Sequence, residues 1–193
     1  MRYKNRAASV LTALAAAGAV SCGSMALAAT AQEGAQPSEI VSGTWQHRQV
    51  TFNYFGITAH FTCEGLEDHV KDLLLVLGAR KDAHVRATGC PGPNAPSQSA
   101  YVRADFYALT PADATATDTV QANWAPLQLA PQHPSFVGDG DCELLEQMKT
   151  FITQNFSLRD MQYRTSCWPH EVTIDAFAIK GQSLKAVPST VKG

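Results

Sequence analysis

Apolar residues recur at helical spacing in two segments of the chain. Between Thr62 and Gly78 they fall every three or four positions on one face, which predicts an amphipathic helix. This stripe consists of Leu66, Val70, Leu73, Leu74 and Leu77. Thr62 is a suitable N-cap because its hydroxyl can accept a hydrogen bond from a free backbone N–H, and Gly78 is a suitable end. In the second segment Asp141 takes the capping position, and the stripe consists of Leu145, Met148 and Ile152.

Six segments alternate polar and apolar residues, which predicts strands. They are 48–55, 83–89, 100–109, 119–125, 159–166 and 171–180. Each predicted helix follows the first of three strands, so the order β-α-β-β occurs twice. We therefore predict an α+β fold, in which two tandem β-α-β-β repeats form an antiparallel sheet with two helices packed on one face.

Short sequence blocks also occur in the same order in both halves of the chain. The blocks of the first half are Val50-x-x-Asn53-Tyr54, Cys63-Glu64-x-Leu66-Glu67, Arg86 before Cys90-Pro91, and Val102-x-x-Asp105-x-x-Ala108-Leu109. Those of the second half are Val120-x-x-Asn123-Trp124, Cys142-Glu143-x-Leu145-Glu146, Arg164 before Cys167-Trp168-Pro169, and Val172-x-x-Asp175-x-x-Ala178-Ile179. Self-similarity of this kind indicates an internal duplication.

The duplication and the turn-forming residues predict the domain organisation. The predicted segments are a first repeat at 44–110, a linker at 111–118 and a second repeat at 119–181, flanked by flexible segments at 29–43 and 182–193. Within the second repeat, the stretch 125–138 contains three prolines and is predicted to be a long loop. Loops of this length are often functional.

The first 28 residues have the features of a secretory signal peptide. A basic start is followed by an alanine-rich apolar stretch from Ala7 to Val20, and Ala26-Leu27-Ala28 fits a cleavage site. The apolar stretch is too short to span a bilayer, and no later segment is long enough. We therefore predict an exported protein, periplasmic or secreted, without a transmembrane segment. In an alternative interpretation Ala19-Val20-Ser21-Cys22 is a lipobox, and Cys22 carries a lipid anchor.

Five cysteines become four when Cys22 is set aside with the signal region, and an even count in an exported chain is typical of disulfides. The duplication favours one pair within each repeat, Cys63 with Cys90 and Cys142 with Cys167. A helix after Cys63 rises roughly 22 Å, and a strand of about seven residues returns roughly 23 Å, which brings Cys90 back to the helix start. The alternative is a redox site, but the chain has no Cys-x-x-Cys pair.

The charge of the chain argues against nucleic acid as a partner. Residues 1–28 hold three of the 15 Lys and Arg residues and none of the 17 acidic ones, so the remaining chain carries a formal charge of −5, 12 against 17. Neutralising phosphates requires clustered Lys and Arg, and no such cluster occurs. The expected partner is instead a protein or a small polar ligand.

Alternation along the strands sorts the two faces of the predicted sheet. If Val102, Ala104, Phe106 and Ala108 point toward the helices, the residues between them point away. The same reasoning brings Arg86 beside Asp105, and Arg164 beside Asp175. The outward residues that we predict as a ligand or partner face are Asn53, Arg86, Tyr101, Asp105, Tyr107, Asn123, Arg164 and Asp175. The pairs are open to three interpretations: structural ion pairs, a pseudo-symmetric binding surface, or a dimer interface.

No motif in the sequence predicts a metal, a cofactor or a catalytic residue. Asp139-Gly140-Asp141 resembles the start of a calcium loop but lacks the later Gly and Glu of an EF-hand. The six histidines are scattered, without a His-x-x-x-His pair. Neither Gly-x-Ser-x-Gly, nor a Gly-rich phosphate loop, nor His-Glu-x-x-His occurs.

Three function classes fit these observations. The first is a non-catalytic binding or envelope-associated module, which the duplicated scaffold without a catalytic motif favours. The second is a secreted inhibitor or structural envelope protein, which a rigid exposed loop at 125–138 would favour. The third is a small hydrolase-like enzyme whose acid and base, such as Asp105, Asp175 and His84, meet only in the fold. A carboxylate with a strongly raised pKa in a pocket would favour this third class.

Overall fold

The computed structural model describes residues 39–92, 94–167 and 177–188, all within the unit Gln36–Gly193. The first half of the chain forms β1 (Ile40–Phe55), α1 (Cys63–Leu77), β2 (His84–Thr88) and β3 (Ser99–Pro111). The second half forms β4 (Val120–Leu129), the 3-10 turn η1 (Asp139–Asp141), α2 (Cys142–Asn155), β5 (Leu158–Thr165) and β6 (Phe177–Ala186). The predicted order β-α-β-β is therefore present in each half.

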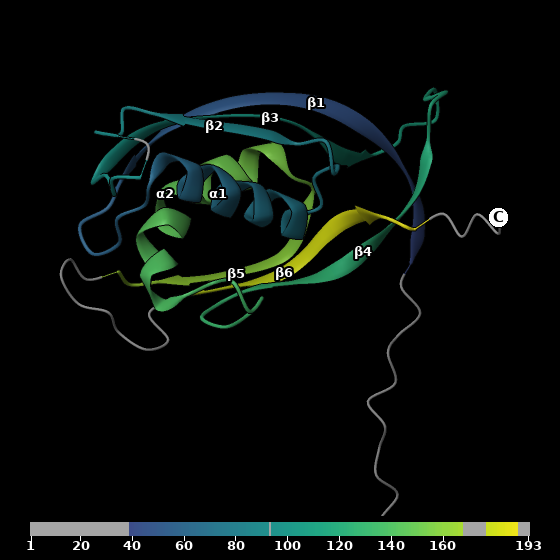
Figure 1. Cartoon of the computed structure of the whole chain (residues 1–193). Coiled ribbons are helices and arrows are strands. Elements are labelled where there is room, and N and C mark those ends of the chain that lie inside the picture. The colour runs from purple at the N-terminus through teal and green to yellow at the C-terminus, as the bar shows by residue number, and fades with distance from the viewer. Residues whose placement is uncertain (1–38, 93, 168–176, 189–193) are drawn as a thin grey trace, which may run out of the picture. The chain divides into compact units, whose positions relative to one another are not determined.

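The strands form one antiparallel sheet of six, in the order β2-β3-β1-β4-β6-β5. Each half contributes three neighbouring strands, with its first strand at the junction and its second strand at an edge. In Figure 1, β1, β2 and β3 lie on one side of the helices and β4, β5 and β6 on the other, so the sheet curves around α1 and α2. The predicted α+β fold, with both helices on one face of an antiparallel sheet, is confirmed.

The two halves of the sheet join where β1 leaves β3 and pairs with β4. The segment from Ile40 to Gly43 pairs with the segment from Val120 to Asn123. Gly43 pairs on both sides, and a Cβ atom there would lie 3.2 Å from Leu109 Cδ2 and 3.3 Å from Ala122 Cβ. Glycine at this position therefore lets three strands approach one another closely.

The core fills the space between the sheet and the helices. All five residues of the predicted first stripe are buried, as are Leu145, Met148 and Ile152 of the second, so both stripes are confirmed. The core also contains three aromatic rings in stacked and edge-on contact, one from β3, one from α2 and one from the residue that ends α2. These rings belong to Phe106, Phe151 and Phe156.

The ends of α1 follow the prediction, whereas the start of α2 does not. Thr62 Oγ1 accepts a hydrogen bond from the Gly65 N–H at 3.0 Å. Gly78 adopts the left-handed conformation, with φ of 103°, and its N–H bonds back to the last turn of the helix. Asp141 occupies the N-cap position of α2, but its carboxylate makes no capping hydrogen bond and instead accepts from the Gly138 N–H at 2.6 Å. The predicted capping role of Asp141 is therefore wrong.

Both predicted disulfides are confirmed. Cys63 is bonded to Cys90, with the two Cα atoms 5.9 Å apart, and Cys142 to Cys167, with the Cα atoms 5.7 Å apart. Each bond ties the first turn of a helix to the segment that follows the next strand.

Several predicted boundaries need correction. β1 begins at Ile40, so residues 40–43 of the predicted flexible segment belong to the sheet. β4 continues to Leu129 and takes the first part of the predicted loop 125–138. β6 continues to Ala186, so residues 182–186 of the predicted tail pair with β4. In each case pairing between distant strands extends a segment that local alternation does not identify.

Some predictions concern residues outside those that the structure describes. They are the signal peptide at 1–28 with Cys22, residues 29–38 and 189–193 of the predicted flexible segments, the first part of the strand predicted at 171–180, and Asp175. These remain predictions from the sequence.

Candidate binding face

The outward side chains of β1, β2 and β3 form what we call the outer face, the side of these strands turned away from the helices. The alternation predicted for β3 is confirmed, because Val102, Ala104, Phe106 and Ala108 are buried and the residues between them are exposed or half-buried. The strand register places the outer residues in cross-strand rows. The outer face comprises His47, Gln49, Thr51, Asn53, Phe55, His84, Arg86, Thr88, Ser99, Tyr101, Arg103, Asp105 and Tyr107.

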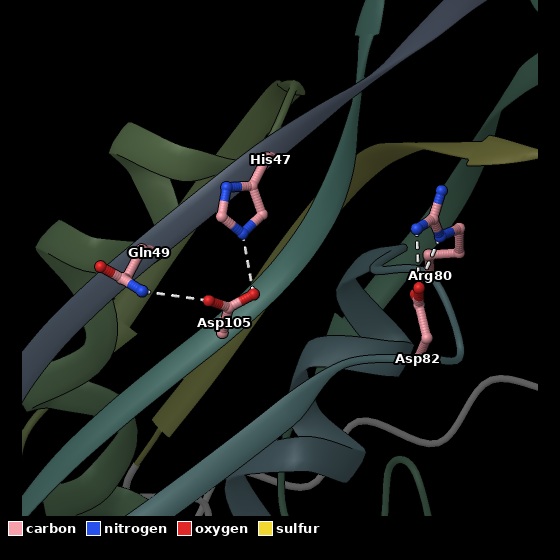
Figure 2. Close-up of polar contacts among 5 residues, drawn as sticks. All are labelled: His47, Gln49, Arg80, Asp82 and Asp105. Carbon is pink, nitrogen blue, oxygen red and sulfur yellow. Dashed lines mark hydrogen bonds and ion pairs between the residues drawn. The ribbon is translucent and has the colours of Figure 1, made fainter.

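Asp105 lies near the middle of the outer face and is held by two side chains of β1. His47 Nε2 lies 2.8 Å from Asp105 Oδ1, and Gln49 Nε2 donates to Asp105 Oδ2 at 3.0 Å (Figure 2). The hydrogen bond from His47, and then that from Gln49, holds the pKa of Asp105 below its ordinary value. Asp105 is therefore an ionised group whose two oxygens are both already bonded.

The predicted pair between Arg86 and Asp105 is wrong. In the register of β2 with β3, Arg86 lies opposite Arg103, and the residue opposite Asp105 is His84. The Arg86 guanidinium approaches Glu67 of α1 instead, with Nη1 and Oε2 3.6 Å apart. Because β2 is an edge strand, Arg86 can reach around it toward the helix.

An arginine from the connection between α1 and β2 lies against the aromatic end of the outer face. The Arg80 guanidinium carbon lies 3.7 Å from the centre of the Tyr107 ring, and the His47 and Tyr107 ring centres are 5.1 Å apart. Asp82 holds Arg80 through two hydrogen bonds of 2.8 and 2.6 Å (Figure 2). These bonds raise the pKa of Arg80 and lower that of Asp82. Tyr107, His47 and Arg80 thus form one connected cluster of rings and charge.

Four members of these contacts were missed from the sequence: His47, Gln49, Arg80 and Asp82. A strand extended toward the N-terminus would have placed His47 and Gln49 on the same side as Asn53, because they alternate with it. No comparable periodic signal precedes β2, since Arg80 and Asp82 lie in a turn.

Of the predicted site residues of the second half, the two that the structure describes, Asn123 and Arg164, do not join the outer face. Asn123 lies on the same side of β4 as Leu127 and Leu129, which pack in the core, so its predicted outward orientation is wrong. Arg164 lies opposite Ala178 on the edge strand β5 and is exposed. Its predicted partner Asp175 is outside the described residues, and the pair remains a prediction.

Beyond Tyr107, the same side of β1 and β3 continues into a second, smaller hydrophobic cluster. Its buried members are Leu109, Ala122 and Leu184. Trp45 and Trp124 pack on it, and an arginine lies over each ring, Arg80 at 5.9 Å and Arg159 at 4.6 Å from the ring centres. Two of the three tryptophans of the chain are therefore packing residues.

A second set of titratable residues is buried between α1 and η1. His69 Nε2 lies 3.0 Å from Asp141 Oδ1, in an ion-pair contact without the alignment of a hydrogen bond. Phe61 and Phe136 pack on the His69 ring, both at 5.5 Å between ring centres. Because Asp141 is engaged with His69 and Gly138, it is not available as a ligand of the calcium loop considered above. In the described part of the chain no group of three or more His, Cys, Asp or Glu residues could hold a metal ion.

Nearby, Tyr54 is almost completely buried and its hydroxyl donates to the Ala59 carbonyl. Burial, followed by the charges of Glu143 and Asp141, raises its pKa. Glu143 accepts hydrogen bonds from the backbone N–H groups of Ile57 and Thr58. These contacts fasten the connection between β1 and α1 to the start of α2.

The chain matches no family model, no curated protein and no solved structure in the comparisons with known proteins. None of the helices described is long and apolar enough to cross a membrane. The two disulfides are typical of a protein in an oxidising, exported environment.

Proposed function

We propose that this protein is an exported, disulfide-stabilised, non-catalytic binding module that recognises its partner through the outer face. The observation that carries the proposal is the fixed contact set around Asp105 and Tyr107 on a helix-free face of the sheet. His47 and Gln49 hold Asp105, and Arg80 lies on Tyr107. Side chains ordered before binding lose little conformational entropy in a complex, and Arg and Tyr are enriched in binding hot spots.

The state of Asp105 favours binding over catalysis. A general acid or base works best with a pKa near the working pH, and desolvation usually raises a carboxyl pKa to that range. The pKa of Asp105 is shifted in the opposite direction by its two hydrogen bonds. An ionised, exposed carboxylate with fixed orientation is instead suited to accept a hydrogen bond or to pair with a cation on a partner.

The loop expected for an inhibitor is shorter than predicted and partly packed on the protein, with Gln132, His133 and Ser135 exposed. β4 takes residues 125–129, and the remainder folds back through hydrogen bonds between Ala130 and His133 and from Gln132 to Val137. Val137 is fully buried, and Phe136 packs on His69. These contacts support a recognition surface on the sheet and not on this loop.

The proposal is tested by capture of partners from the envelope fraction of the native host with the full, C-terminally tagged protein. We expect a stoichiometric protein or a co-purifying small molecule, identified by mass spectrometry. Arg103→Glu and Tyr107→Ala should each reduce its recovery by about tenfold or more, as for hot-spot residues. Glu146→Gln, on the exposed side of α2, is the matched control and should retain it.

Thermal unfolding of each variant shows whether a loss of capture reflects a loss of fold. Recovery of no companion, or equal recovery with the wild type and both outer-face variants, would contradict recognition through this face.

A further inference from the structure

The outer face ends in an uncharged aromatic groove where β1 ends. Its volume is about 310 Å³, and the residues that line it carry no charged side chain. In the strand register Tyr101 stands between Asn53 of β1 and Thr88 of β2, and Ser99 lies opposite Phe55. We call this the Tyr101 groove, formed by Asn53, Thr88, Ser99 and Tyr101 with Phe55 beside it.

One exposed aromatic ring, that of Tyr101, lines this groove, and a second, that of Phe55, lies opposite Ser99 at its end. Tyr101 is 49% exposed and Phe55 is 51% exposed. Among the described residues, only one other large hydrophobic side chain, Ile40, is comparably exposed, and it lies at the opposite end of β1. Exposed aromatic surface next to polar groups is characteristic of binding sites, because a ring supplies contact area at a small cost in conformational entropy.

The polar groups of the groove are free to bind a ligand. In the described part of the chain, the side chains of Asn53, Thr88 and Tyr101 make no hydrogen bond to protein groups, and the hydroxyl of Ser99 makes none either. An amide and three hydroxyl groups both donate and accept hydrogen bonds. A matching ligand therefore has groups that both donate and accept hydrogen bonds, as alcohols do. It is also uncharged, because the groove has no charged side chain that could pair with a buried charge.

The backbone of β1 and β3 at the groove is already bonded, and on the edge strand β2 the Ala87 N–H donates to Glu67 Oε1 at 2.9 Å, which argues against a peptide added as a strand. The N–H of Phe55 donates to Gln147 Oε1 and its carbonyl accepts from Gln147 Nε2, both at 2.8 Å. Tyr101 lies in a strand that is paired on both sides. Recognition at this groove therefore depends on its side chains. A peptide that adds as a strand binds mainly through backbone hydrogen bonds, and these groups are already occupied here.

The same contacts make the groove rigid. Gln147 fixes the end of β1, the Gly56 N–H donates to the Gln98 carbonyl at 2.8 Å, and the Cys63–Cys90 disulfide follows directly after Thr88 and Gly89. A ring held on such a scaffold offers a flat surface that needs no rearrangement to bind.

We propose that the Tyr101 groove binds an uncharged sugar unit of an oligosaccharide or polysaccharide. The apolar C–H face of the sugar packs on the Tyr101 ring, its edge contacts Phe55, and its hydroxyls bond to Asn53, Thr88 and Ser99. The inference rests on the binding function proposed above and specifies the ligand class at one end of the outer face.

The test is a titration of the full exported protein with the neutral cellohexaose, hexa-N-acetylchitohexaose and maltohexaose and with the acidic trigalacturonic acid, followed by calorimetry and by NMR shifts of the groove residues. At about 10 mM, even a millimolar Kd gives extensive occupancy. We expect at least one neutral oligosaccharide to bind and to shift the signals of Asn53, Thr88 and Tyr101.

Variants separate stacking from unspecific contact. Tyr101→Ala should weaken binding by about tenfold or more, whereas Tyr101→Phe, which keeps the ring, should stay within about threefold. Ile40→Ala removes a comparably exposed apolar side chain elsewhere and should leave the affinity unchanged. Because the Tyr101 side chain is exposed, we expect these variants to remain folded, and thermal unfolding of each variant tests this.

The sugar assignment would be overturned if none of the neutral oligosaccharides bound, if trigalacturonic acid bound more tightly than they do, or if Tyr101→Ala left the affinity unchanged. Capture of a partner that depends on Arg103 and Tyr107 would in that case leave the broader binding function standing. If neither sugar binding nor capture of a partner were observed, both proposals would be overturned.

Discussion

At the residue scale, the outer face depends on one carboxylate whose neighbours determine its protonation. Asp105 accepts hydrogen bonds from His47 and Gln49, and its pKa lies below the ordinary value. Since the folded pKa is below the unfolded one, these contacts stabilise the fold above the ordinary carboxyl pKa, and the contribution is lost as pH falls through the lowered value.

The first prediction concerns this pKa. His47→Ala removes the largest cause of the lowered value, the hydrogen bond from His47, so the pKa of Asp105 should rise toward the ordinary carboxyl value, and Gln49→Ala should raise it less. A carboxyl-carbon NMR titration between acid and neutral pH measures both. Asp113, whose pKa is lowered mainly by Thr115, is the internal control and should titrate as in the wild type. An unchanged Asp105 titration in His47→Ala would show that the contact does not persist in solution.

The buried pair of His69 and Asp141 provides the second prediction. Their side chains are only 16% and 6% exposed, and the pair links a helix of the first half to a turn of the second. His69→Phe keeps the ring contacts with Phe61 and Phe136 but leaves Asp141 Oδ1 without its neighbour. We expect a loss of about 1–3 kcal/mol in the free energy of unfolding, measured with urea.

The control for this pair is a double-mutant cycle with Asp141→Asn. Removing His69 should cost less when the carboxylate is already replaced by an amide, because the coupling between the two groups is gone. Equal costs in both backgrounds would mean that the contact between His69 and Asp141 does not contribute to stability.

At the element scale, the end of α1 is positioned against β6 by a glycine. Gly78 has a φ of 103°, and a Cβ atom there would lie 2.8 Å from the Leu184 carbonyl oxygen. A side chain would therefore face two penalties, the left-handed backbone conformation and a clash with the backbone of the second half.

Comparison with Gly89 separates these penalties and gives the third prediction. Gly89 also has a positive φ, 93°, but a Cβ atom there would meet nothing within 4 Å. Gly89→Ala should therefore cost about 1 kcal/mol from the backbone alone. Gly78→Ala should cost at least about 1 kcal/mol more, from the clash. Urea unfolding of both variants measures the difference, and equal losses would contradict close packing of α1 on β6.

At the scale of the whole molecule, the two halves join in one sheet through a short pairing of β1 with β4. Only four residues of β1, from Ile40 to Gly43, make this pairing. The same residues precede the part of β1 that carries His47, Gln49 and Asn53, so the junction also holds the outer face in register.

Truncation of β1 provides the fourth prediction. A chain that begins at Thr44 loses the pairing of residues 40–43 and should be less stable than a chain that begins at Glu39 by roughly 2–4 kcal/mol. Urea unfolding of the two chains measures the difference. Equal stability would mean that the junction contributes nothing to the fold.

The sequence alone determined the fold class, both disulfides, the buried stripes of α1 and α2 and the outward face of β3. Each of these follows from a short-range period, 3.6 residues in a helix and two in a strand, or from the repeated cysteine spacing. Such periods report which side of an element is buried, but not which element lies beside it.

Only the tertiary structure decided which side chains and strands lie next to one another. It paired Asp105 with His47 rather than Arg86, placed Asn123 on the same side of β4 as Leu127 and Leu129, joined Ile40–Gly43 to β4, and placed Phe55 opposite Ser99. These outcomes depend on the register between strands that are distant in the chain, and a shift of one residue moves every side chain to the other face. Because that register is set by packing of the complete sheet around both helices, local alternation could not reveal it.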